Sequence, residues 1–243
     1  DLVANWMRVG FIHGVMNTDN TSISGETFDY GPCAFMNAYH PDTVYSSIDY
    51  YGRYSFGNQA PIIKWNIARF AETLMRILHE DKDQSLKLAQ AAIDGFVMLK
   101  KIGLEESSPK HCGLVEELLN LMSRLRMDYS NTFRDLSQEE PSGDSPINSP
   151  EFQPWLEQWK DAVDQSAGME QARKLMSRHN PVVIPRNHLV EQALDEAADG
   201  DMALYNQLLE VMSNPYQPQD GLEGFTTPPE AGFEKSYQTF CGT

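Results

Sequence analysis

The sequence predicts a mainly α-helical protein with a small β component near its N-terminus, an α+β protein overall, and three observations support this. From Pro61 onward, apolar residues recur every three or four positions, which places them on one face of a helix. Residues 1–60 are instead rich in Gly, Asn, Asp and Tyr and hold few long apolar periods. Hydrophobic residues make up 41% of the chain, enough to build a core, so wholesale disorder is excluded.

The first sixty residues are expected to contain one short helix, a polar loop and two short strands. The helix covers about residues 2–9, and the loop carries HGVMNTDN at residues 13–20. Two short strands flank SISGETFDYGP at residues 22–32, and an irregular stretch follows to Gln59. Tight backbone and polar residues of this kind are where functional sites usually lie.

Apolar periodicity and helix-terminating residues predict the next three helices. The first of the three begins near Pro61, which suits a first helical turn, and we expect its apolar stripe to pack in the core: Ile63, Ile67, Phe70, Leu74 and Leu78. The second fits about residues 83–101, with Gly103 near its C-cap, and the third fits residues 114–136.

A polar segment rich in Ser and Pro, SQEEPSGDSPINSP, is the clearest predicted loop. It either separates two helical subdomains or is a mobile insertion, so we divide the chain into residues 1–136, 137–150 and 151–243. In the last part Trp155 and Trp159 are one turn apart and are expected to pack inward together. Its helices are predicted over about residues 152–163, 169–178, 187–198 and 201–212, with no periodicity in the tail from Asn214.

Charge and hydropathy exclude several classes of protein. The 19 Lys and Arg against 35 Asp and Glu give a net charge of −16, whereas a nucleic-acid binder needs a basic patch, so we expect no nucleic-acid partner. No apolar run approaches the roughly 20 residues that span a bilayer, and the N-terminus lacks a signal-peptide pattern. We therefore expect no membrane partner, a cytoplasmic location and a monomer.

The three cysteines are widely spaced and form no CxxC pair, which argues against a disulfide framework and against a cysteine zinc site. A reducing compartment fits best. Burial as structural thiols is the default interpretation of Cys33 and Cys112, whereas Cys241 lies in the tail.

Several common active-site motifs are missing. No G-x-G occurs, and no HExxH or GxSxG is present. GRYSFGNQ at residues 52–59 has the glycine spacing of a Walker A motif but lacks its Lys and Ser/Thr, so we reject a P-loop.

One constellation of oxygen-bearing side chains remains: Asp19 and Asn20 in HGVMNTDN, then Asp29 in DYGP. Magnesium prefers oxygen ligands, and a kinase site uses one Asp as proton acceptor with an Asn and the D-F-G Asp on the metal. Here, however, Asp19 and Asn20 are adjacent, whereas a protein kinase separates the two by four residues. Spacing alone therefore leaves a second interpretation equally open, in which these residues and Asn17 only form turns.

The residues around this constellation resemble the SelO family of protein adenylyltransferases. The resemblance runs through WMRVGFIHGVMNTDNTSISGETFDYGPCAFMNAY and YGRYSFGNQAPIIKWNIARFAETL. It returns in NPVVIPRNHLVEQALDEAADGDMALYNQLLEVMSNPY and in the final YQTFCGT, and is weakest in the middle helices. HGVMNTDN followed by DYGP is the most specific part.

The resemblance implies a protein-kinase-like fold that transfers AMP from ATP to Ser, Thr or Tyr hydroxyls of protein substrates, with Mg²⁺ or Mn²⁺. It implies Asp19 as the proton acceptor and Asn20 and Asp29 as metal ligands, with Asp29 also beside the nucleotide phosphates. It also implies that an N-terminal lobe, absent from this chain, would precede Asp1. Residues 1–136 would then be the C-terminal lobe and residues 151–243 a helical extension, with a mitochondrial location if the source is eukaryotic.

Two other functions stay open: a non-catalytic protein-binding module, and a conventional phosphotransferase on the same fold. The family also implies a regulatory thiol in the tail, where Cys241 lies. Cys33 is a hypothetical partner for it, although Tyr45 fits the position where some relatives have that Cys.

Five further polar residues are expected to have structural roles rather than to contact substrate. His13 is expected to support the catalytic loop rather than to bind a ligand, and Asn187 to cap a helix. Salt bridges and caps are favoured over contact with substrate for three residues near the apparent site: Arg53, Asn66 and Arg69.

Overall fold

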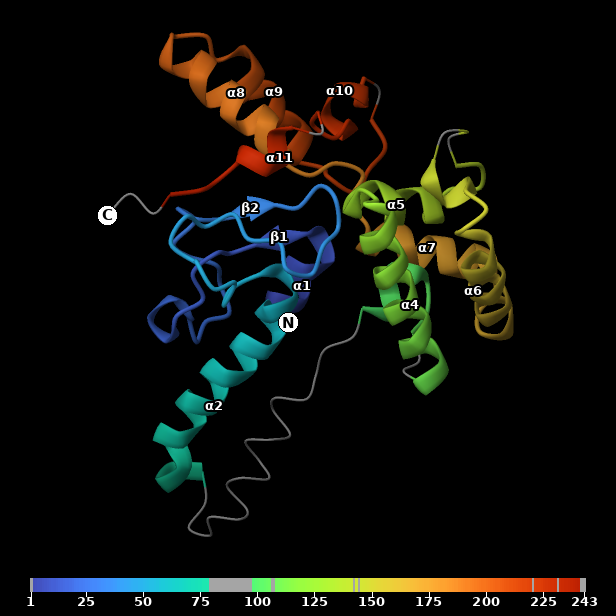
Figure 1. Ribbon diagram of the computed structural model, residues 1–243, viewed down its shortest axis with the longest axis horizontal. Coiled ribbons are helices and arrows are strands. Elements are labelled where there is room, and N and C mark those ends of the chain that lie inside the picture. The colour runs from blue at the N-terminus through green and yellow to red at the C-terminus, as the bar shows by residue number, and fades with distance from the viewer. Residues whose placement is uncertain are drawn as a thin grey trace.

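In the residues that it describes, a computed structural model is mainly helical and holds a small two-stranded antiparallel sheet, which confirms the mainly helical α+β class (Figure 1). The sheet and the long helix α2 lie on one side of a group of helices, and the C-terminal helices lie above the sheet in this view. The structure describes residues 2–78, 98–105, 108–141, 143, 145–219, 221–230 and 232–240.

Both polar segments identified in the sequence lie in the connection between the two strands of the sheet. Helix α1 (Leu2–Val9) leads into β1 (Phe11–Ile12), which pairs with β2 (Ala34–Phe35). The second strand follows DYGP as predicted, but the first precedes HGVMNTDN instead of following it. The reason is burial: Phe11 and Ile12 are 5% and 0% exposed, whereas residues 23–26 are exposed. One connection between paired strands therefore carries both polar motifs.

Helix α2 (Gln59–Leu78) begins two residues before Pro61, after a 3₁₀ turn (Phe56–Asn58). Its predicted apolar stripe packs in the core only in part. Ile63 is partly buried against the main core, whereas Ile67 is partly buried and Phe70 is 41% exposed, because these residues line an open cavity against α1. In Figure 1, α2 extends away from the other helices.

Of the second predicted helix, residues 83–97 lie outside the described residues, and its end is a 3₁₀ turn (Leu99–Ile102). Gly103 ends this turn with φ +76°, as predicted for its C-cap. A Cβ at this position would lie 2.6 Å from the Cβ of Ala172, so glycine also permits a close approach to the helix that contains Ala172.

The third predicted helix, residues 114–136, is two helices: α4 (Pro109–Leu125) and α5 (Tyr129–Ser137). Arg126 adopts a left-handed conformation with φ +52° and ends α4. Asp128 then begins α5, where its carboxylate accepts the backbone N–H of Asn131 at 2.8 Å.

The next two helices, α6 (Gln153–Gln165) and α7 (Met169–His179), complete the main core. Trp155 and Trp159 are buried and stacked, with ring centroids 5.9 Å apart, as predicted. Their indole N–H groups donate to the carbonyls of Leu114 and Ile102, which ties α6 to the preceding elements. The polar loop before α6 holds a 3₁₀ turn (Pro146–Asn148), and α5 before it packs against α7 after it.

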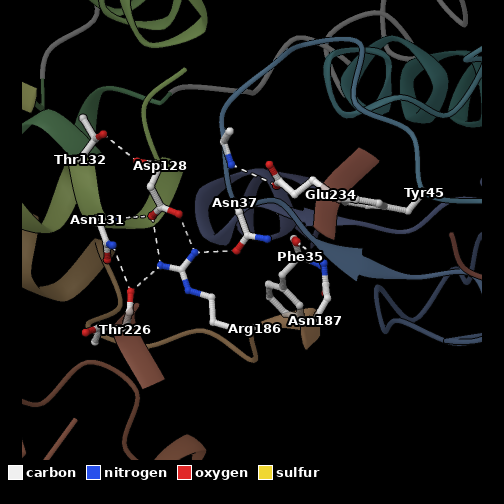
Figure 2. A network of polar contacts seen from close by, with 11 residues as sticks. Phe35, Asn37, Tyr45, Asp128, Asn131, Thr132, Arg186, Asn187, Thr226 and Glu234 are labelled. Atoms are coloured by element: carbon white, nitrogen blue, oxygen red, sulfur yellow. Dashed lines mark hydrogen bonds and ion pairs between the residues drawn. The ribbon is translucent and has the colours of Figure 1, made fainter. Parts of the chain in front are cut away.

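The C-terminal helices are α8 (Asn187–Ala198), α9 (Ala203–Met212) and two short helices in the tail that periodicity did not predict, α10 (Glu223–Thr226) and α11 (Phe233–Ser236). Helix α8 begins where expected, but the cap assignment was wrong. The Asn187 side chain instead accepts the N–H of Phe35 at 3.0 Å and donates to its carbonyl at 2.7 Å (Figure 2).

The described helices include none with the length and apolar character needed to cross a membrane.

Candidate active site

A buried histidine organises the connection between the strands. His13 is fully buried, and its Nε2 lies 2.9 Å from the carbonyl oxygen of Phe28. Burial lowers the pKa of His13, which favours a neutral ring. A neutral ring that accepts the N–H of Val15 at Nδ1 carries its proton on Nε2, and Nε2–H then donates to Phe28. His13 therefore supports the loop, as expected.

Asn20 and Asp29 meet across this connection. Asn20 lies in a 3₁₀ turn (Thr18–Asn20), and its Nδ2 donates to Oδ2 of Asp29 at 3.0 Å and to the carbonyl of Val15 at 3.1 Å. Asp29 has φ +59°, a left-handed conformation that Asp tolerates better than most side chains. The bond from His13 to the preceding residue and the bond from Asn20 hold it in place.

Asp19 lies beside this pair in the chain and faces solvent. Its side chain is exposed, and within the described ranges its carboxylate makes no hydrogen bond or ion pair. An unpartnered carboxylate on a structured turn is free to accept a proton or a hydrogen bond from a ligand. The three predicted residues thus occupy one short region, with Asn20 and Asp29 in contact and Asp19 open.

The donor atoms left over in this region suit a hard cation. Because Nδ2 of Asn20 is engaged, Oδ1 of its amide and Oδ1 of Asp29 remain without a protein donor among the described residues. Magnesium binds such oxygens together with water and substrate phosphates. No group of three or more His, Cys, Asp or Glu side chains within metal-binding reach is found in the part of the chain that the structure describes. Water or phosphate oxygens would therefore have to supply the other ligands.

A cavity of about 750 Å³ adjoins Asn20. Residues 2–6 of α1, residues 16–26 and the facing side of α2 form its walls, which are largely apolar. Asp19 and Asp29 do not line it. Asn66 on α2 is 4% exposed and donates to the carbonyl of Met16 at 3.0 Å and to the hydroxyl of Thr21 at 2.8 Å. It therefore has the structural role preferred from the sequence and fixes the segment from Met16 to Thr21 against α2.

The C-terminal tail holds the segment that follows DYGP, which the sequence did not indicate. The hydroxyl of Thr239 donates to the carbonyl of Pro32 at 2.6 Å, and its backbone pairs with Tyr45 and Ser47. Glu234 accepts the N–H of Ala38 at 3.2 Å and the hydroxyl of Tyr45 at 3.4 Å (Figure 2). These partners are about 190 to 210 residues apart in sequence, so no local pattern could predict them.

Comparison with known proteins gives a consistent result. The family model described as protein adenylyltransferase SelO matches residues 1–213. The protein nucleotidyltransferase YdiU of Alkaliphilus metalliredigens (strain QYMF) is 48% identical over 254 residues, covering 100% of this chain and 52% of the relative. YdiU proteins of Bacillus mycoides (strain KBAB4) and Bacillus cereus (strain AH820) are each 46% identical with the same coverage. The chain thus spans about half the length of the curated relatives it matches.

Proposed function

The chain belongs to the SelO family, and from this premise we propose that it contributes the acceptor-activating and metal-binding residues of a protein adenylyltransferase. The enzyme would transfer AMP from ATP to Ser, Thr or Tyr hydroxyls of protein substrates. In this proposal residues 1–136 form the C-terminal lobe of a kinase-like fold, and residues 151–243 form a helical extension.

The contact between Asn20 and Asp29 carries this proposal. It links the two motifs of the family resemblance by a 3.0 Å hydrogen bond and leaves one oxygen of each side chain available. Asp19, next in the chain to Asn20, is exposed and without a protein partner among the described residues. A proton acceptor beside a pair of hard oxygen ligands is the arrangement that nucleotide transfer to a hydroxyl requires.

Asp19 is proposed to orient the acceptor hydroxyl and take its proton. The acceptor oxygen then forms a bond to the α-phosphorus of ATP, while the bond from that phosphorus to the oxygen bridging to the β-phosphorus breaks. The electron pair of the broken bond leaves with pyrophosphate. His13, through Phe28, and Asn20 keep Asp29 in its left-handed conformation throughout.

Asn20 and Asp29 would hold Mg²⁺ or Mn²⁺ through the oxygens not used in their mutual hydrogen bond. When bound, such a cation neutralises negative charge on phosphate oxygens. Removal of either oxygen ligand is therefore expected to weaken nucleotide transfer without unfolding the protein.

The test is the intact mass of the purified protein, and of a full-length relative, after incubation with ATP and Mg²⁺ or Mn²⁺. A gain of one adenylyl group that disappears in Asp19→Asn or Asp29→Asn supports the proposal. Asp164→Asn, at an exposed position on α6, is the matched control and should behave like the wild type.

Other outcomes identify the alternatives. A phosphoryl gain would mean a conventional phosphotransferase. No gain in either protein, with or without a thiol reductant, would favour a non-catalytic protein-binding module.

A further inference from the structure

A row of aromatic and arginine side chains is anchored to the turn that carries Asp19. The hydroxyl of Tyr54 donates to Oδ1 of Asn17, the residue that precedes the 3₁₀ turn (Thr18–Asn20). The carboxylate of Asp49 accepts the backbone N–H groups of Arg53 at 2.9 Å and Tyr54 at 2.8 Å. The position of this row is therefore fixed relative to Asp19.

The row continues from Tyr54 onto helix α2. The Cζ atom of Arg53 lies 5.7 Å from the ring centroid of Tyr54 and 5.3 Å from that of Trp65. The Cζ atom of Arg69, one helical turn after Trp65, lies 5.3 Å from the same indole ring. Trp65 is 45% exposed, so the row lies on the surface. We call Tyr54, Arg53, Trp65 and Arg69 the arginine row.

Arg53 differs from the other polar residues near the site because its charge is not matched. The amide N–H groups of Asn66 are used by the loop, and Arg69 pairs with Glu72 at 2.6 Å. No carboxylate of the described residues lies within 4.0 Å of the Arg53 guanidinium group, which only stacks on aromatic rings. A stacked guanidinium leaves its N–H edge free to donate to a carboxylate. The structural interpretation from the sequence therefore fits Asn66 and Arg69 but not Arg53.

Two guanidinium groups gather on one aromatic ring of an acidic protein. Arg53 and Arg69 stack on the indole ring of Trp65 in a protein of net charge −16. Glu72 pairs with Arg69 in an exposed and weak ion pair, and the carboxylate of Asp49 is held by backbone N–H groups, so the guanidinium edge of Arg53 remains for a ligand. At physiological ionic strength the screening length is about 8 Å, so a bound acidic segment responds mainly to the charges at the row itself, among which the guanidinium group of Arg53 has no ion pair.

We propose that the arginine row binds acidic side chains that flank the acceptor hydroxyl of the protein substrate. The inference rests on the proposed function, because it takes Asp19 as the group that meets that hydroxyl. The occupant is an acceptor polypeptide because the row is tethered to Asn17, two residues before Asp19. The neighbouring Tyr50 and Tyr51 are 85% and 97% exposed and offer further contact area to an extended polypeptide.

The test is a binding measurement that needs no catalysis. Fluorescence anisotropy compares two labelled peptides, each with one central Ser: one has Asp and Glu on both sides, and the other has Asn and Gln at the same positions. We expect the protein without nucleotide to bind the acidic peptide at least about fivefold more tightly at low salt. The preference should shrink as salt is raised.

The double variant Arg53→Gln/Arg69→Gln is expected to reduce the preference to less than about twofold. Arg124→Gln, at an exposed position on α4, is the matched control and should retain it. Circular dichroism verifies that all variants are folded. Equal binding of the two peptides by the wild type would overturn the proposal. If the double variant loses as much affinity for ATP as for the acidic peptide, the proposal is also overturned, since the row would then bind phosphate.

The inference and the proposed function fail separately. If AMP is transferred but the acidic and amide peptides bind equally well, the docking surface is wrong and the enzyme assignment stands. If the acidic preference depends on Arg53 and Arg69 but no AMP is transferred, the surface stands and the adenylyltransferase assignment falls.

Discussion

Arg186 and Asp128 form a two-point ion pair that joins the start of α8 to the start of α5, with Nη1–Oδ2 at 2.6 Å and Nη2–Oδ1 at 3.1 Å (Figure 2). Arg186 is 1% exposed and also donates to Oδ1 of Asn37 at 2.7 Å and to the carbonyl of Thr226 at 3.0 Å. One guanidinium group thus connects the C-terminal helices to the end of the β2 segment and to α5.

Replacement of Arg186 should be strongly destabilising. Arg186→Ala leaves the largely buried carboxylate of Asp128 without its cation, and breaking a buried pair costs about 3–5 kcal/mol. Arg186→Lys should recover only part of this, because an ammonium group cannot reproduce the two parallel bonds. Urea unfolding measures the free energy. Arg124→Ala, at an exposed position, should change it by less than about 0.5 kcal/mol, and a similar small change for Arg186→Ala would contradict the network.

Asn187 is expected to hold β2 through both a donor and an acceptor. Asn187→Asp keeps an acceptor for the N–H of Phe35 but places a negative charge against its carbonyl, so it should be at least as destabilising as Asn187→Ala. The expected loss is about 1–3 kcal/mol in chemical unfolding. Amide hydrogen exchange should accelerate at Phe35 in Asn187→Ala, which removes the acceptor of its N–H. Unchanged exchange there would show that Asn187 does not hold the strand.

Local sequence patterns predicted helix ranges correctly but did not predict the tertiary contacts of individual side chains. The ranges of α1 and α8 were predicted to the residue, because periodicity and helix-start residues are local signals. The partner of Asn187 is 152 residues away, and tertiary contact overrode the local preference for a cap. The break at Arg126 was missed because no Gly or Pro marks it. The apolar stripe of α2 correctly predicted a helix, but Phe70 on that stripe is exposed rather than in the core.

The candidate site was found by motif rather than by periodicity. HGVMNTDN and DYGP identified Asp19, Asn20 and Asp29, and the structure adds the contact between Asn20 and Asp29. Spacing alone could not separate a site from a set of turns, because Asp and Asn favour both. Arg53 received a structural interpretation because its lack of an ion pair among the described residues is visible only in three dimensions.

Stability should fall in acid partly because of His13. Burial lowers its pKa in the folded protein, so as pH decreases below about 6.5 the unfolded chain takes up this proton first. The contribution is therefore present above about pH 6.5 and is lost as pH falls through the lowered folded value. His13→Gln removes the titration while keeping an N–H donor. The free energy of unfolding from pH 7.5 to about 5 should fall more steeply in the wild type than in His13→Gln. Parallel curves would contradict this assignment.

The thiol of Cys33 is expected to react slowly. Burial raises its pKa to about 11, with a further contribution from the charge of Asp29, so little thiolate exists near neutral pH. Thiol–disulfide exchange requires the thiolate, which bears on the hypothesis that Cys33 pairs with Cys241. The tail does approach this region, since the hydroxyl of Thr239 donates to the carbonyl of Pro32, the neighbour of Cys33. Cys241 itself lies outside the described residues.

Alkylation kinetics and non-reducing peptide mapping test this together. At pH 8, Cys33 should be alkylated more than about tenfold more slowly than a free cysteine, and it should be recovered as a thiol after mild oxidation. Thr239→Val, which removes the hydroxyl bond to Pro32 at nearly constant volume, should loosen the tail and increase the rate. Recovery of a Cys33–Cys241 disulfide would instead establish the redox pair, and would mean that contact with the tail overcomes the low reactivity of the partly buried Cys33 thiol.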